Sequence, residues 1–230
     1  MSIALAMRGS DGLVLAADSR VTSAQGTADI SQKFLQVNRD TGVMTYGLSA
    51  VGYIGIIALA DRVASDRTNF PYFVPIRDIG QDVFSGCYQG WCSQNAWYQG
   101  YPADVSFILG GYDHVETNQF RVVHFTSPGF DPVENDRPYL VAAQWHVAEM
   151  LASKLYYPGI TVDRVVDLAV FLLSATMTAC PTVGGPMQIA TVTTAQGFRG
   201  IHQDEIAQRM DRCQHLFTGV RVLLQELVAT

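Results

Sequence analysis

Residues 2–22 read SIALAMRGSDGLVLAADSRVT, and this stretch decides the fold that the rest of the chain completes. Two apolar segments, Ile3–Arg8 and Gly12–Ala17, surround a short polar turn at residues 9–11, which predicts a β-hairpin. The second segment is apolar without interruption, as is typical of a strand that is covered on both faces. The polar string DSR follows it at residues 18–20. The sequence therefore predicts a strand inside a layered structure, with charged side chains at its end.

The other apolar segments divide into two kinds of pattern. Strands are predicted at residues 33–38, 43–48, 105–110, 120–125, 187–193 and 198–201. Helices are predicted at residues 52–67, from 77 into the 91–97 region, at 139–155, at 162–177 and from Asp204 onward. Residues 22–31 and 127–138 are predicted to be loops, and Pro71 and Pro75 to interrupt the chain before the second helix. Strands that alternate with pairs of helices indicate antiparallel sheets under helical layers, an α+β architecture.

The predicted last helix carries an apolar stripe. Its members recur at alternating spacings of four and three residues: Ile206, Met210, Cys213, Phe217, Val220, Leu224 and Leu227. Such a stripe packs either on the sheet of its own chain or on a neighbouring chain, and both interpretations stay open. We expect Gly219 to end or bend this helix.

Length and composition fit a single domain over residues 1–230, because 48% hydrophobic content can build one substantial core. Charged residues make up only 16% of the chain, against a usual share of about a quarter. Either a large core or a surface buried in an oligomer explains this deficit. The aromatic run at residues 88–101 favours packing against a partner subunit, since no basic residue accompanies it for stacking on nucleic-acid bases.

Several classes of function are disfavoured. The net charge is −6, and no lysine or arginine lies between Arg77 and Arg121, so a basic track for nucleic acid is missing. The four cysteines form no CxxC pair and no secretory leader is indicated, so we expect a cytoplasmic protein with free thiols. The most apolar helix is too short to span a membrane. The five histidines lack metal-ligand spacing, so we expect no metal and no other cofactor.

Removal of Met1 would make Ser2 a candidate catalytic residue, because Ser2 would then carry both a hydroxyl and a free α-amine. A serine needs a base to become a nucleophile. The α-amine, with a pKa near 7.7–8.0, is neutral in roughly a tenth to a third of molecules near neutral pH, against about 0.1% for an ordinary lysine. The α-amine is therefore the expected proton acceptor. Lys33, which shares the chain with only one other lysine, Lys154, is expected to stay charged and to lower the pKa of that amine and hydroxyl.

Asp18 and Arg20 complete this hypothesis. Asp18 is expected to hold Lys33 in place and keep it protonated, and Arg20 to brace the loop after the strand. A structural interpretation stays open for each residue. Ser2 can be an ordinary exposed terminus, Asp18 can shape a turn after a strand, and Asp18 with Lys33 can form an ion pair between two hairpins.

The string GLVLAADSRVT at residues 12–22, followed by KFLQVN at residues 33–38, resembles the opening of proteasome β-type subunits. The order of predicted elements is also similar to that family's four-layer α-β-β-α sandwich. The resemblance therefore implies the fold of the N-terminal-nucleophile hydrolases. The family's α-type subunits carry an additional leading helix, and none is predicted here.

The resemblance also implies roles for single residues. The family's first mature residue falls on Ser2, although the family usually has threonine there. Its conserved charged positions match three residues of this chain: Asp18, Arg20 and Lys33. The backbone N–H that binds the oxyanion falls on Ser49, or on Gly47 if the loop is counted differently.

Two parts of the family pattern differ in this chain. The family usually has an aspartate and a serine just before a Gly-Gly pair, and both support the nucleophile. Here residues 178–185 read TACPTVGG, so the aspartate position falls on Ala179 or Cys180, and Thr182 is the residue whose hydroxyl would replace the serine's. The Gly/Ser-rich turn before the third helix is replaced by AAQW at residues 142–145. The α-amine therefore has fewer polar partners than usual, and we expect weak, altered or absent activity.

The resemblance implies a peptidase that hydrolyses peptide bonds through Ser2 in a homo-oligomeric ring, in stacked rings. It also implies peptides or unfolded proteins as substrates and an ATPase unfoldase as a partner. Two alternatives remain. The missing carboxylate and the aromatic run favour a catalytically silent ring or scaffold protein. An amide-bond transferase is the other alternative, since an amine instead of water can resolve an acyl-enzyme.

Overall fold

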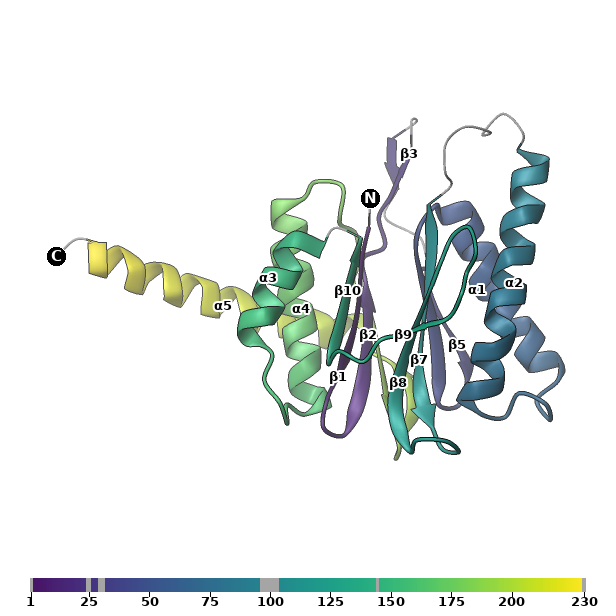
Figure 1. Cartoon of the computed structure of the whole chain (residues 1–230). Helices are drawn as coiled ribbons and strands as arrows, with labels where there is room; N and C mark the ends of the chain where they lie inside the picture. The colour runs from purple at the N-terminus through teal and green to yellow at the C-terminus, as the bar shows by residue number, and fades with distance from the viewer. Residues whose placement is uncertain (1, 24–25, 29–31, 96–103, 144, 229–230) are drawn as a thin grey trace.

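The computed structural model describes residues 2–23, 26–28, 32–95, 104–143 and 145–228, so residues 96–101 of the aromatic run lie outside it. Figure 1 shows two β-sheets face to face, with helices on both outer sides. This is the expected α+β architecture with the layers α-β-β-α. The starts of β1 and of the chain lie at one end of the sandwich, shown at the top of Figure 1.

The first sheet is antiparallel and has the strand order β10-β1-β2-β11-β12. Its strands are β1 (Ile3–Arg8), β2 (Gly12–Ala17), β10 (Tyr139–Ala143), β11 (Gln188–Thr193) and β12 (Gly197–Gly200). The predicted hairpin of β1 and β2 is confirmed, with Leu5 opposite Ala16. All residues of β2 are buried, as the uninterrupted apolar pattern predicted.

The second sheet is also antiparallel and has the order β5-β6-β7-β8-β9. Its strands are β5 (Phe34–Asn38), β6 (Thr41–Gly47), β7 (Val105–Asp113), β8 (Gln119–Thr126) and β9 (Val133–Glu134). A small separate ribbon consists of β3 (Val21–Ser23) and β4 (Gly26–Ala28). Residues 22–31 were predicted to be a loop, and this ribbon corrects that prediction.

Helices cover the outer face of each sheet. On the second sheet lie α1 (Ser49–Ser65) and α2 (Phe73–Gln94), and on the first lie α3 (Trp145–Leu155) and α4 (Val162–Ala179). The last helix, α5 (Gln203–Val228), packs on α4 with its first part and then extends away from the sandwich (Figure 1). Within the described residues, none of these helices combines the length and the apolar character that crossing a bilayer requires.

The alternation of side chains along β1 explains the layers. Ile3 and Leu5 point toward the helices of the first sheet and join the cluster that α4 covers. Ala4 and Ala6 point the other way and join the cluster between the sheets. A strand alternates its side chains with a period of two, so a strand buried on both faces is apolar at every position. β1 and β2 therefore form the centre of the molecule.

One predicted helix begins too early. Residues 139–155 were predicted to be helical, but residues 139–143 form β10 and the helix starts only at Trp145. β10 pairs with β1 in antiparallel register, with Ile3 opposite Ala143. The free edge of β1 offers backbone partners that a helix at this place would leave unused.

Three further predictions, on Pro75, on the connection at residues 127–138 and on Gly219, differ from the structure. Pro75 does not break the chain, because it lies in the first turn of α2, where its missing N–H has no helical acceptor to lose. The predicted connection at 127–138 contains the short strand β9. Gly219 neither ends nor interrupts α5, which continues to Val228.

Candidate active site

Ser2 and Asp18 lie side by side at one end of the first sheet. Ser2 precedes β1 and Asp18 follows β2, and antiparallel pairing brings the start of the first strand beside the end of the second. The backbone N–H of Ile3 donates to Oδ1 of Asp18 over 3.1 Å. The N–H of Asp18 donates to the carbonyl oxygen of Ile3 over 3.4 Å. Strand pairing thus fixes the carboxylate beside the candidate nucleophile.

Lys33 reaches this place from the second sheet, since it lies one residue before β5. Its ammonium donates to three oxygen atoms: Ser2 Oγ at 3.0 Å, Asp18 Oδ1 at 2.5 Å and the Arg20 carbonyl at 2.9 Å. An ammonium has three donors, so these partners use its full capacity. The structure therefore brings together the three side chains that the sequence singled out.

The three residues of the candidate site are buried. Exposed fractions are 7% for Ser2, 4% for Lys33 and 0% for Asp18. Burial lowers the pKa of the Lys33 ammonium below its ordinary value, while the Asp18 carboxylate opposes this change through its charge and its hydrogen bond. In such surroundings the electric field of the ammonium acts on the Ser2 hydroxyl with little screening.

The loop after α4 is attached to the strand end that carries Asp18. Oδ2 of Asp18 accepts the N–H of Gly184 at 3.2 Å. In return, the carbonyl of Gly184 accepts the N–H groups of Ser19 (3.1 Å) and Arg20 (2.9 Å). The carboxylate of Asp18 therefore joins three parts of the site, namely the start of β1, the lysine and this loop.

The Arg20 side chain contacts the loop after α4, a partner that the sequence did not indicate, whereas the bracing of the loop after its own strand stays a prediction. Its guanidinium donates to the carbonyl of Pro181 at 2.7 Å, in the loop after α4. A Cβ atom on Gly184 would lie 2.5 Å from the Arg20 guanidinium carbon, so the guanidinium uses the space that a glycine leaves there. The backbone carbonyl of Arg20 accepts the hydrogen bond from the Lys33 ammonium. The Arg20 side chain positions the loop after α4.

The structure places the remaining predicted residues on neighbouring segments. Gly47 ends β6 with a positive φ of 94°, and Ser49 is the first residue of α1. The N–H groups of a first helical turn have no partner within the helix, so Ser49 offers the kind of donor that an oxyanion needs. Thr182 lies half-buried in the loop that Arg20 holds, and Ala179 ends α4. The roles of these residues rest on the family resemblance.

Sequence reasoning missed one residue of this neighbourhood. The side-chain oxygen of Gln188 accepts the backbone N–H of Lys33 at 2.9 Å, although the two residues are 155 positions apart. Gln188 begins β11 and carries no motif. No sequence signal could have found it, because the contact depends on how the two sheets pack.

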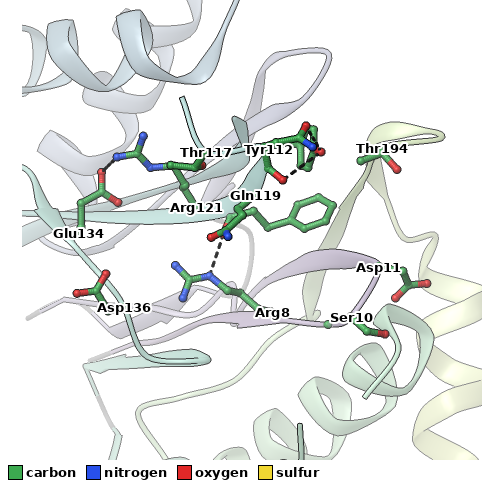
Figure 2. Close-up of a pocket in the computed structure, with 13 residues that line it drawn as sticks. Arg8, Ser10, Asp11, Tyr112, Thr117, Gln119, Arg121, Glu134, Asp136 and Thr194 are labelled. Carbon is green, nitrogen blue, oxygen red and sulfur yellow. Dashed lines mark hydrogen bonds and ion pairs between the residues drawn. The ribbon is translucent and has the colours of Figure 1, made fainter. Parts of the chain in front are cut away.

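A separate cavity of about 680 Å³ lies at the other end of β1, where Figure 2 shows the side chains of its wall. The six residues of β1, at about 3.3 Å each, separate this end from Ser2 by roughly 20 Å. Arg8 donates to three backbone oxygens there, those of Phe120 (2.9 Å), Asn135 (2.6 Å) and Arg137 (2.7 Å). Figure 2 also shows Arg121 paired with Glu134. Arg8 therefore links the end of β1 to the second sheet, whereas Arg121 and Glu134 pair within the second sheet.

A metal-binding arrangement is not found in the described part of the chain. No group of three or more His, Cys, Asp or Glu side chains there is placed to hold an ion.

The family model and the two relatives described here are all proteasome subunits. A family model described as "Proteasome subunit" matches residues 2–192. Proteasome subunit alpha type-3 of Saccharomyces cerevisiae is 25% identical over 214 residues, which cover 93% of this chain and 78% of the yeast protein. Proteasome subunit alpha type-4 of Petunia hybrida is 25% identical over 199 residues, which cover 84% of this chain and 75% of the plant protein.

Solved structures with the same fold are similar over nearly the whole chain. Anbu (ancestral beta-subunit) from Yersinia bercovieri has a TM-score of 0.78 at 16% identity and covers 97% of this chain and 96% of its own. The helical assembly of the Anbu complex from Pseudomonas aeruginosa has a TM-score of 0.80 at 17% identity, with the same coverage. These structures share the fold of this chain, and the resemblance noted in its sequence is confirmed.

Proposed function

Because the chain belongs to the proteasome subunit family, we propose that it is an N-terminal-nucleophile hydrolase that cleaves peptide bonds through Ser2. One observation carries this proposal: among buried residues, the Lys33 ammonium lies 3.0 Å from Ser2 Oγ and 2.5 Å from the Asp18 carboxylate. A hydroxyl next to a cation that is itself held by a carboxylate fits an activated nucleophile. We also propose that residues 1–230 form one domain and that the protein is cytoplasmic.

The proposed reaction begins with removal of Met1, which frees the α-amine of Ser2. The neutral α-amine takes the hydroxyl proton as Oγ attacks the substrate carbonyl, and the oxyanion that forms is bound by the N–H of Ser49 or Gly47. The proton then passes to the leaving amine as the peptide bond breaks, which leaves an ester on Ser2. Water resolves this ester and returns the hydroxyl. General base catalysis of this kind contributes about 10²–10⁴ in rate.

Lys33 acts in this scheme as a fixed positive charge. It stabilises the deprotonated hydroxyl and the neutral amine, so it lowers the pKa of both groups. Asp18 keeps the ammonium in place and, through Gly184, holds the loop that carries Thr182. We propose that the Thr182 hydroxyl supports the α-amine where the family has a serine.

The decisive experiment compares Ser2→Ala with Ser10→Ala, which changes a hydroxyl at the opposite end of β1. Intact mass first reports whether Met1 is removed from each protein. A peptidyl electrophile should then label the wild type and Ser10→Ala on Ser2, and both should hydrolyse fluorogenic peptides. Ser2→Ala should lose labelling and lower hydrolysis by about 10³-fold or more. Full peptide hydrolysis by Ser2→Ala would refute the proposal.

A catalytically silent member of the family is the second candidate. It is favoured by the absence of the supporting carboxylate at Ala179 and Cys180, and by the fact that the curated relatives named above are alpha-type subunits. In this case the protein assembles normally, while Ser2 stays unlabelled after Met1 has been removed. Rapid, stoichiometric labelling of Ser2 decides against it.

We further propose that the chain assembles with copies of itself into a ring or a helical array. The Anbu complex from Pseudomonas aeruginosa, which shares this fold, forms a helical assembly. The low share of charged residues, 16%, fits a surface that is partly buried between subunits. Peptides or unfolded proteins are the proposed substrates, and an ATPase unfoldase is the proposed partner.

A further inference from the structure

The parts of the candidate site come from both sheets. Ser2 and Asp18 adjoin strands of the first sheet, whereas Lys33 precedes the first strand of the second. The contacts between the sheets near this level are mostly apolar, and apolar packing is not directional. The Lys33 ammonium forms three directional bonds to residues next to the first sheet, and a directional bond to the Lys33 backbone would also set where this side chain begins.

Gln188 supplies such a bond. Its side-chain oxygen accepts the backbone N–H of Lys33 at 2.9 Å. On the other side, the carbonyl of Lys33 accepts the N–H of Thr45 at 2.8 Å, within the second sheet. The peptide groups of Lys33 are thus held by one contact from each sheet. Among the described strands, β5 is an edge strand that pairs only with β6, so its start has no strand neighbour on the open side.

The position of Gln188 is tied to that of Asp18. In the register of β11 and β2, Gln188 lies opposite Ala17, the residue before Asp18. The backbone pairing that locates Asp18 therefore locates Gln188 as well. A shift of β11 along β2 would move the glutamine and the aspartate apart, and the lysine would lose one of its two anchors.

We propose that Gln188 is a positioning residue that aligns the Lys33 ammonium with Ser2 and Asp18, an inference that rests on the proposed function of Ser2. A neutral acceptor suits this place, because a carboxylate there would add negative charge beside the lysine. The groups that face the ammonium are the Ser2 hydroxyl, the Asp18 carboxylate and the Arg20 carbonyl, with the α-amine of Ser2 once Met1 is removed.

The test uses three variants of the full chain. Gln188→Met removes the acceptor and keeps the length of the side chain, whereas Gln188→Glu restores an acceptor. Gln203→Met is the matched control, because the Gln203 side chain donates to the carbonyl of Met187 at 2.8 Å, next to Gln188 but without contact to the lysine. Thermal unfolding of each variant reports stability, and the rate of Ser2 labelling by a peptidyl electrophile is followed from about pH 6 to about pH 10.

A second measurement does not depend on activity. Lys33 and Lys154 are the two lysines of the chain, so ¹³C labelling of lysine gives two Cε signals, and Lys154→Arg assigns them. The titration of the Lys33 signal yields the pKa of Lys33 directly. Burial lowers this pKa in the wild type. We expect it to rise in Gln188→Met, where the ammonium is freer to reach water, and to rise in Gln188→Glu because of the added charge.

Gln188→Met should lower the labelling rate by about 10–100-fold, since a misplacement of about 1 Å costs up to about 100-fold. Gln188→Glu should recover part of this loss with a shifted pH profile, and Gln203→Met should stay within about twofold in rate, with no shift of the lysine pKa. Wild-type labelling and an unchanged Lys33 pKa in folded Gln188→Met would overturn the inference. If the wild type itself is never labelled, the proposed function fails, whereas the lysine titrations still decide whether Gln188 positions Lys33.

Discussion

At the scale of single residues, a buried lysine organises the candidate site. An ammonium in a dry environment is costly unless it is paired and fully hydrogen-bonded. Lys33 meets this condition with a carboxylate, a hydroxyl and a carbonyl, and the backbone N–H groups of Asp18 and Arg20 are themselves hydrogen-bonded. Asp18 is the partner that cannot be replaced easily, because it also binds the N–H groups of Ile3 and Gly184. The same geometry serves stability and the proposed chemistry.

A second buried carboxylate allows a prediction on pH. Burial raises the pKa of Asp113, but hydrogen bonds from the N–H groups of Glu116 and Val115, from Arg121 and from Thr117 outweigh it and hold the value at about 2. The ordinary value is 3.8, so the charged form is favoured in the folded state and its contribution is complete above that pH. Asp113→Asn should therefore lower the free energy of unfolding by about 2 kcal/mol near neutral pH.

This difference should shrink as the pH falls from about 4 to about 2, because the unfolded chain then binds the proton more readily than the folded one. Urea unfolding of both proteins at a series of pH values measures it. A difference that stays constant down to pH 2 would contradict the assignment of the low pKa to Asp113.

At the scale of elements, each strand or helix forms where its apolar pattern finds a covering layer. β2 forms as a continuous apolar strand because α4 covers one face and the second sheet the other. β10 forms because β1 has a free edge, although its residues also suit a helix. α5 is anchored by its first part. Arg209, 8% exposed, binds the carboxylates of Asp163, Asp167 and Glu205.

The extension of α5 permits a test of assembly. Ile206 and Cys213 of the apolar stripe are buried against the first helical layer, whereas the stripe's later members lie in the part of α5 that extends away from the sandwich (Figure 1). Deletion of residues 216–230 keeps Arg209 and these anchors. We expect the truncated chain to fold with a similar melting temperature but to lose self-assembly, which light scattering after size-exclusion chromatography measures. An assembly of unchanged size would show that α5 does not carry the contact.

At the scale of the whole molecule, the two sheets approach each other closely because glycines face the gap. Gly42 and Gly110 are opposite each other in the register of β6 and β7. A Cβ atom on Gly110 would lie 2.7 Å from a methyl carbon of Leu13 and 2.8 Å from one of Leu15, both fully buried. The absence of side chains at these positions lets the second sheet bring Lys33 to the first.

Gly110→Ala should therefore destabilise the protein by about 1–3 kcal/mol, since the added methyl group would force two buried leucines to shift. Gly86→Ala is the matched control. Gly86 lies in α2 with nothing within 4 Å of an added Cβ, so the higher helix propensity of alanine should stabilise the protein by about 0.5–1 kcal/mol. Chemical unfolding measures both. Equal effects in the same direction would argue against tight packing between the sheets.

The sequence alone determined the central hairpin, the buried character of β2, the layered α+β class and the set Ser2, Asp18 and Lys33. These follow from local patterns and from a motif, because apolar periodicity and residue spacing are written along the chain. Only the tertiary structure decided that β10 joins β1, that Asp18 holds Gly184 and that Gln188 holds Lys33. Such bonds join residues more than a hundred positions apart, and they form only after two sheets have packed at a fixed distance and register.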